Sequence, residues 1–106
     1  MVDRREHSRR TVCIEANLFW RDEKPSILAC KIVDLSGVGA RIRAHFLLPL
    51  PSRVFLIKDG GENIYECETI WQEPGTAGLM LLDLCASSKR QDLLNEIETA
   101  QMIYPP

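Results

Sequence analysis

The amino-acid sequence predicts a mainly β fold: a six-stranded antiparallel barrel followed by one C-terminal helix. Short stretches with apolar side chains at every second residue recur along residues 11–84, and clusters of Gly, Pro, Asp and Ser separate them. This two-residue period is typical of strands that bury one face. Helical spacing of apolar side chains follows only after residue 88. A chain of 106 residues has room for one domain, so this pattern favours a small closed barrel.

The first half of the chain contains three expected strands. Residues 11–20 form the first, because every second side chain is apolar from Val12 through Ile14, Ala16 and Leu18 to Trp20, and these alternate with Cys13, Glu15, Asn17 and Phe19. A polar turn at 22–26 leads into the second strand, residues 27–33. The third covers residues 38–44, where small and apolar residues alternate with Arg41 and Arg43. Pro49 and Pro51 bracket the loop that follows.

The second half contains three more strands and the helix. Strands are expected at 53–58, 64–71 and 78–84, separated by turns at Asp59-Gly60-Gly61 and Pro74-Gly75. A helix is expected over about 88–104, because Ser88 and Gln91 have capping-box spacing and apolar residues then recur with helical period. We expect both tryptophans, Trp20 and Trp71, to be core or barrel-rim residues rather than groups that stack on a ligand.

Charge is unevenly distributed along the chain. Residues 1–45 hold 9 basic and 6 acidic side chains, whereas residues 46–106 hold 4 and 9. We therefore divide the chain into a flexible basic arm, residues 1–10, and one domain, residues 11–106, and expect an anionic partner for the arm. A duplex-binding protein usually carries more positive charge than this chain, whose net charge is −2.

The sequence also indicates a compartment. No apolar run approaches the roughly 20 residues of a membrane span, and the polar start is unlike a secretory signal. Four cysteines lie in or beside apolar stretches without any C-x-x-C spacing: Cys13, Cys30, Cys67 and Cys85. Reduced thiols in a cytoplasmic protein are therefore expected, with neither a disulfide framework nor a metal site.

Two short motifs are the candidates for function. Arg5-Glu6-His7-Ser8-Arg9 has the form R-x-x-x-R, and Asp34-Leu35-Ser36-Gly37-Val38-Gly39 has the form D-x-S-x-x-G. Each is weak alone, but the pair at this separation is roughly a one-in-a-thousand coincidence. Equal steps back from a hairpin turn near Lys24 place Arg9 opposite about Gly39. The two motifs are therefore expected at the same end of the barrel.

These residue types suit a guanine nucleotide. A guanidinium matches either guanine O6 and N7 or a phosphate, and Asp34 can accept from guanine N1–H and the exocyclic amine. Ser36 can add a hydroxyl contact, and Gly39 would let the ligand approach the backbone. In the alternative interpretation the arm is a solvated tail and Asp34 and Ser36 only cap a turn. The pairing of the motifs favours the ligand site.

With these two motifs the sequence resembles the PilZ domain family, the bacterial receptor module for cyclic di-GMP. The resemblance extends over essentially the whole chain, through Gly-Ala-Arg-Ile at 39–42, Ile70-Trp71 and Gly78. It departs in the last strand, which lacks the aromatic residue common there. The family implies a six-stranded barrel with a C-terminal helix.

The same resemblance implies roles for individual residues. Arg5 and Arg9 would clamp guanine and phosphate by wrapping over the ligand, and Asp34, Ser36 and Gly39 would form the opposite wall. An arginine at the position of Arg4 goes with a stacked ligand dimer, so two ligand molecules in one site are an option. Arg10, Arg41 and Arg43 would add phosphate contacts or would be ordinary surface residues.

The function expected from this resemblance is that of a non-enzymatic cyclic di-GMP receptor without a cofactor. Closure of the arm would change the surface offered to a downstream protein, or to a second copy of the chain. The output would be motility, adhesion, exopolysaccharide or cell-cycle control. The main alternative is a ligand-independent interaction module of the same fold. A nucleic-acid binder with a basic arm is less favoured, and an enzyme least, because no nucleophile–base pair or P-loop is present.

Overall fold

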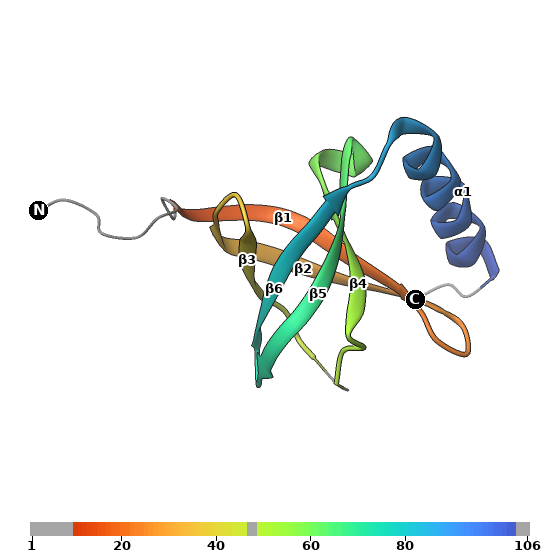
Figure 1. Ribbon diagram of the computed structural model, residues 1–106. Coiled ribbons are helices and arrows are strands. Elements are labelled where there is room, and N and C mark those ends of the chain that lie inside the picture. Colours follow the sequence, from red (N-terminus) through yellow and green to blue (C-terminus); the bar gives the residue numbers. More distant parts are fainter. Residues whose placement is uncertain (1–9, 47–48, 104–106) are drawn as a thin grey trace, which may run out of the picture.

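The computed structural model describes residues 10–46 and 49–103 as a closed antiparallel barrel with one helix at its end (Figure 1). The strands follow one another around the barrel in the order β1-β2-β3-β6-β5-β4. In chain order the elements are β1 Arg10–Arg21, β2 Pro25–Leu35, β3 Gly39–Arg43, β4 Arg53–Lys58, a 3-10 turn Asp59–Gly61, β5 Asn63–Glu73, β6 Thr76–Leu84 and α1 Ser87–Ile103. The fold predicted from the two-residue period is confirmed.

Several element boundaries differ from those predicted. Strand β2 continues to Leu35 and so includes Asp34, which the sequence pattern placed after the strand. Strand β1 already begins at Arg10, whose Cα pairs with that of Leu35, so Arg10 belongs to the strand rather than to the predicted arm. Backbone pairing with a neighbouring strand extends β1 and β2 beyond their apolar runs, and side-chain periodicity cannot reveal that. The remainder of the predicted arm, residues 1–9, lies outside the described residues.

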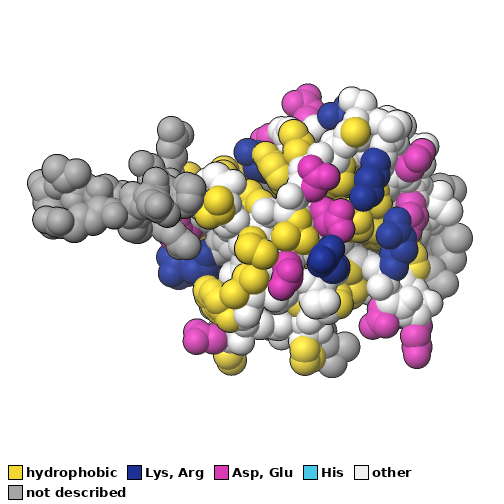
Figure 2. Space-filling view, viewed as in Figure 1, with side chains coloured by type: hydrophobic (Ala, Val, Ile, Leu, Met, Phe, Trp, Pro, Cys, Tyr) yellow, Lys and Arg dark blue, Asp and Glu magenta, His cyan; other side chains and the backbone are white. Residues whose placement is uncertain are grey.

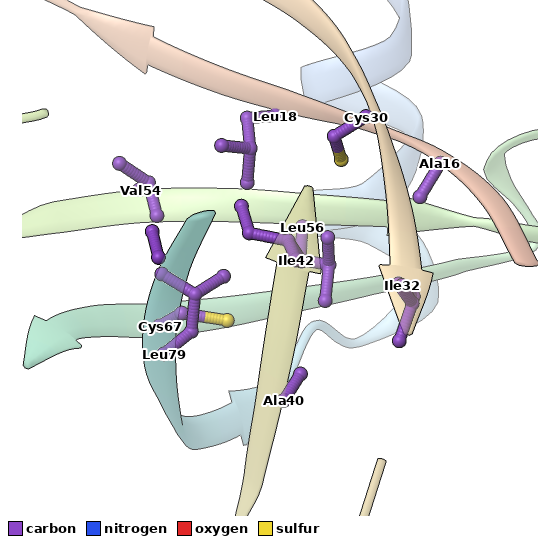
Figure 3. Close-up of a cluster of buried hydrophobic side chains, with 11 residues drawn as sticks. Ala16, Leu18, Cys30, Ile32, Ala40, Ile42, Val54, Leu56, Cys67 and Leu79 are labelled. Atoms are coloured by element: carbon purple, nitrogen blue, oxygen red, sulfur yellow. The ribbon is translucent and has the colours of Figure 1, made fainter. Parts of the chain in front are cut away.

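The main core fills the barrel with side chains from all six strands. Figure 3 shows these side chains gathered between the strands, and the buried members are Ala16, Leu18, Cys30, Ile32, Ala40, Ile42, Val54, Leu56, Cys67, Ala77 and Leu79. They alternate along each strand because successive residues point to opposite faces of a sheet. Burial raises the pKa of the Cys30 and Cys67 thiols to about 12, so both stay protonated at neutral pH. All four cysteines are free.

A second core lies outside the barrel, under α1. Phe19, Ile57, Ile64, Cys85 and Leu93 are buried together there. Phe19 follows Leu18 on β1, so the two side chains point to opposite faces of the strand: Leu18 enters the barrel and Phe19 meets the helix. At the edge of this core the Arg21 guanidinium donates two hydrogen bonds to the Glu96 carboxylate of α1. The contacts of β1 with α1 therefore lie at the C-terminal end of the strand, and Arg10 lies at the opposite end (Figure 1).

Three irregularities in pairing occur along one row of the barrel. The register shifts between Thr11 and Ile14 on β1, between Ile32 and Asp34 on β2, and between Thr69 and Trp71 on β5. Bulges of this kind increase local twist and redirect side chains, and they are common beside functional sites. All three register shifts are next to the row of paired residues that contains Asp34, the first residue of the D-x-S-x-x-G segment.

Candidate functional site

One row of paired residues crosses five strands of the barrel. Thr11 of β1 pairs with Asp34 of β2, and Asp34 pairs with Arg41 of β3. Arg41 pairs in turn with Gly78 of β6, and Gly78 with Trp71 of β5. Neighbouring strands are about 4.8 Å apart, so these residues are direct neighbours in this order. The row brings the acid and the guanidinium of one hairpin together with an indole that is distant in sequence.

The turn between β2 and β3 is held by Ser36. The Ser36 backbone N–H donates to the Gly39 carbonyl oxygen at 2.9 Å, and Ser36 Oγ accepts from the Gly39 N–H at 3.1 Å. Ser36 Oγ also lies 3.4 Å from the Gly39 carbonyl oxygen, which is long for a hydroxyl donor. The serine therefore shapes the turn mainly as an acceptor, and its hydroxyl proton can turn to any acceptor that comes closer.

Two glycines, Gly39 and Gly78, place no side chain on the surface beside this turn. A Cβ added at Gly39 would lie 3.0 Å from the Leu79 carbonyl oxygen, and one added at Gly78 would lie only 2.1 Å from Trp71 Nε1. The Trp71 indole therefore occupies the space over Gly78 that a side chain would fill. Beside it is a hollow of about 250 Å³, and its lining residues are Ala40, Arg41, Ile70, Trp71, Gly78 and Leu79.

Trp20 is a core residue as predicted, whereas of the two places predicted for Trp71, core or barrel rim, the core is wrong. Trp20 is half-buried and packs against the barrel core. Trp71 is 42% exposed and lines the hollow next to Arg41, so it does not belong to the core. The sequence alone shows a tryptophan on one expected strand and a glycine on the next. It does not show that Trp71 pairs with Gly78, because that pairing depends on a bulge that shifts the β5–β6 register.

Arg41 is the cation of the row. Its side chain is exposed, and it forms no ion pair with another residue in the described part of the chain. Asp34, its neighbour on β2, is half-buried. Lys31 and Arg43 face each other one step further along the same two strands, so the outer face of β2 and β3 carries three basic side chains near Asp34. Such a face attracts anions.

The predicted register of the first hairpin is wrong by three residues. Counting from a turn near Lys24 would place Arg10 opposite residue 38, and its partner is Leu35. The hairpin turns one residue earlier, and the bulge between Thr11 and Ile14 adds a further shift. Strand β1 therefore begins beside Leu35 and Ser36. The predicted site residues Arg4, Arg5 and Arg9 lie outside the described residues.

Replacing Gly78 with alanine is expected to displace Trp71. The new methyl group would collide with the indole, which would have to move away from Gly78 and become more exposed to water. We expect a red shift of the tryptophan emission and stronger quenching by acrylamide. Gly37→Ala is the matched control, because nothing lies within 4 Å of a Cβ at that position. An unchanged emission spectrum in Gly78→Ala would contradict the Trp71–Gly78 contact.

Neither a metal centre nor a membrane helix is found in the described part of the chain. Among residues 10–46 and 49–103, no group of three or more His, Cys, Asp or Glu side chains could hold a metal ion. Within the same residues, no helix combines the length and apolar character that crossing a membrane requires.

Comparisons with known proteins point to the fold. No protein-family model matches the chain, and no curated protein sequence matches it. Among solved structures it is similar to the Bacillus subtilis inhibitor of motility (MotI/DgrA), with 17% sequence identity and a TM-score of 0.56. The match covers 99% of this chain and 55% of the other, so the chain spans about half the length of that protein. The two share a fold at this level of identity.

Proposed function

We propose that the chain is a non-enzymatic receptor for cyclic di-GMP of the PilZ type. The observation that carries this proposal is the row from Asp34 through Arg41 to Trp71, beside a turn that Ser36 holds in shape. A guanine base needs acceptors for its N1–H and amine, a flat apolar surface for its ring and a cation for its phosphate. Asp34 and Arg41 provide the acceptor and the cation on the neighbouring strands β2 and β3, and Trp71 provides the flat surface on β5, one strand beyond β6.

Each residue of the row has a distinct part in this proposal. Asp34 accepts hydrogen bonds from the guanine edge, and the base lies in the hollow against Trp71, where stacking contributes about 1–3 kcal/mol. Arg41 neutralises a phosphate, and the Ser36 hydroxyl donates to a ligand oxygen. Gly39 has no side chain, so the ligand can approach the backbone closely there.

The arginines of the R-x-x-x-R motif complete the site in this proposal. Arg10 pairs with Leu35 of the D-x-S-x-x-G segment. Arg9 is the preceding residue, and consecutive Cα atoms are about 3.8 Å apart. Arg5 is within about 18 Å of Arg10 by chain length. We propose that Arg5 and Arg9 close over the ligand, that Arg10 contacts a phosphate, and that Arg4 supports a second, stacked ligand molecule.

The output we propose is control of a downstream protein in the cytoplasm of a bacterium. Ordering of the arm over the ligand would change the surface that this protein meets. Among the outputs we propose motility first, ahead of adhesion, exopolysaccharide or the cell cycle, because the structurally similar protein is an inhibitor of motility. The alternative is an interaction module of the same fold that works without ligand.

An isothermal titration of the purified chain with cyclic di-GMP, with GTP as control, tests the proposal. We expect micromolar or tighter binding, which corresponds to about 8 kcal/mol, and at least tenfold weaker binding of GTP. A stoichiometry of two ligands per chain would support the role of Arg4. The absence of binding by a sample shown to be folded would reject the receptor and favour the ligand-independent module.

A further inference from the structure

The outer face of the paired strands β1 and β2 changes from charged to apolar along its length. Its side chains come in three cross-strand pairs: Glu15 with Lys31, Asn17 with Ala29, and Phe19 with Ile27. The pairing is regular over residues 14–21, and the residues between these pairs point into the barrel core. Phe19 and Ile27 belong to the second core under α1. The face therefore has a charged end and an apolar end.

Two adjoining hollows lie on this face. The larger is about 630 Å³ and lies at the charged end, where its lining includes Ala29, Lys31 and Arg43. The smaller is about 250 Å³ and reaches α1, and its apolar lining consists of Ile27, Ile57, Leu94 and Ile97. Glu15 and Asn17 line both hollows, so together they form one groove, which we call the β1–β2 groove. No residue of the groove has a part in the nucleotide site proposed above.

Two cations lie side by side at the charged end of the groove. Lys31 of β2 pairs with Arg43 of β3, and both side chains are exposed. Like charges directly opposite each other on neighbouring strands repel. Neither cation forms an ion pair with another described residue. Glu15, the partner of Lys31 on β1, balances only one of them, so one positive charge is left over.

Several other basic side chains of the surface lie beside acids. Figure 2, which looks onto β6, shows Lys and Arg side chains next to Asp and Glu side chains. Arg53 and Lys89, for example, lie 3.3 Å and 3.4 Å from carboxylate oxygens of Glu66. The neighbouring cations Lys31 and Arg43 differ from these, because an anion between them would relieve their repulsion.

The apolar end of the groove lies between the strands and α1. Leu94 of α1 reaches over the turn after β4, where a Cβ added at Gly61 would lie 2.8 Å from its Cδ2 atom. Ile97 is the next half-buried residue on the same side of the helix, three positions further on. Among the described residues, only Glu15 and Asn17 bring polar side chains to this hollow. An apolar chain can enter it without burying an unpaired polar group.

The distance between the two ends sets the length of a ligand that uses both. Lys31 and Ile27 are four residues apart on β2, which corresponds to about 13 Å along the strand. A molecule with an anionic head and an unbranched apolar tail of about this length matches the groove from end to end.

We propose that the β1–β2 groove binds a free single-chain anionic amphiphile, such as a fatty acid of medium chain length. Its head group lies between Lys31 and Arg43, and its tail runs past Ala29 to the apolar end under α1. Binding does not require a nucleotide. The groove is therefore a second ligand site whether or not the receptor function holds.

Titration of the isotope-labelled chain with decanoate, followed by backbone amide shifts in NMR spectra without nucleotide, tests the proposal. We expect saturable shifts at residues 15–17, 27–31 and 94–97. Affinity should rise from hexanoate to decanoate by about fourfold for each CH₂ group buried. Decanol and decylamine, which have the same chain with a neutral or cationic head, should bind at least tenfold more weakly than decanoate.

Substitutions in the groove test each part of the site. Ala29→Phe places a ring in the middle of the groove and should weaken decanoate binding at least tenfold. Ala86→Phe is its matched control, because Ala86 is also an exposed alanine but lies before α1, and it should change the affinity less than twofold. Lys31→Gln should weaken binding severalfold, whereas Lys24→Gln, which removes the same charge from the β1–β2 turn, should not.

Removal of the acid should act in the opposite direction. Glu15→Gln should strengthen decanoate binding severalfold, because Lys31 then has no carboxylate opposite it. Equal binding by Ala29→Phe and Ala86→Phe would overturn the groove, and decanol binding as tightly as decanoate would overturn the charged end. Binding to phosphatidylglycerol vesicles without binding of decanoate would overturn the free ligand. Urea unfolding of each variant checks that it folds, and Ala29→Leu replaces Ala29→Phe if that variant does not.

Discussion

Replacing Asp34 with alanine should weaken cyclic di-GMP binding by about tenfold to a hundredfold. The carboxylate is the acceptor for two guanine donors in the proposed complex, and a bidentate contact of this kind is worth about 1–3 kcal/mol. Asp34 lies on β2 between Thr11 of β1 and Arg41 of β3, and it is the one carboxylate of the row, so no other side chain of the row can replace it. Titration of the variant with cyclic di-GMP measures the effect directly.

Asp92→Ala is the matched control for this experiment. Asp92 is an exposed carboxylate of α1, at the other end of the barrel, and the substitution changes the net charge equally. Arg9→Ala should weaken binding in the same range as Asp34→Ala. If both residues hold the same guanine, the losses in the double variant should be less than additive. Equal binding by Asp34→Ala and Asp92→Ala would contradict the proposed site.

Replacing Phe19 with alanine should lower the free energy of unfolding by about 3–5 kcal/mol, the range for a fully buried phenylalanine. Phe19 is completely buried in the second core, and its ring centroid lies 6.3 Å from that of Phe55. The Arg21 guanidinium covers the same contact, 5.5 Å from the Phe19 ring centroid. Loss of the ring would leave a cavity between β1 and α1, because neither element can close the gap alone.

Urea unfolding followed by far-ultraviolet circular dichroism measures this loss. Phe55→Ala provides the comparison, because the same side chain is removed from β4 at a half-buried position. We expect its cost to be clearly smaller. If Phe19→Ala cost no more than Phe55→Ala, the second core would not be what fastens the helix. Helical signal lost from folded Phe19→Ala would show that α1 depends on this core.

The amino-acid sequence already determined the kinds of element and their order. Alternation of apolar residues depends only on the two faces of a strand, so it predicted six strands, and helical spacing after residue 88 predicted α1. The D-x-S-x-x-G pattern identified Asp34, Ser36 and Gly39, because the residue types themselves define the turn and its acceptors. These are local properties, and neighbouring residues are enough to fix them.

The tertiary structure decided which residues meet. The pairing of β3 with β6 and the bulges of β1, β2 and β5 placed Asp34, Arg41 and Trp71 in one row. Register depends on how whole strands pack around a common core, and a bulge shifts it without any local signature in the sequence. The same packing turned Phe19 toward α1. Periodicity can show that a strand has two faces, but only the closed barrel determines what each face contacts.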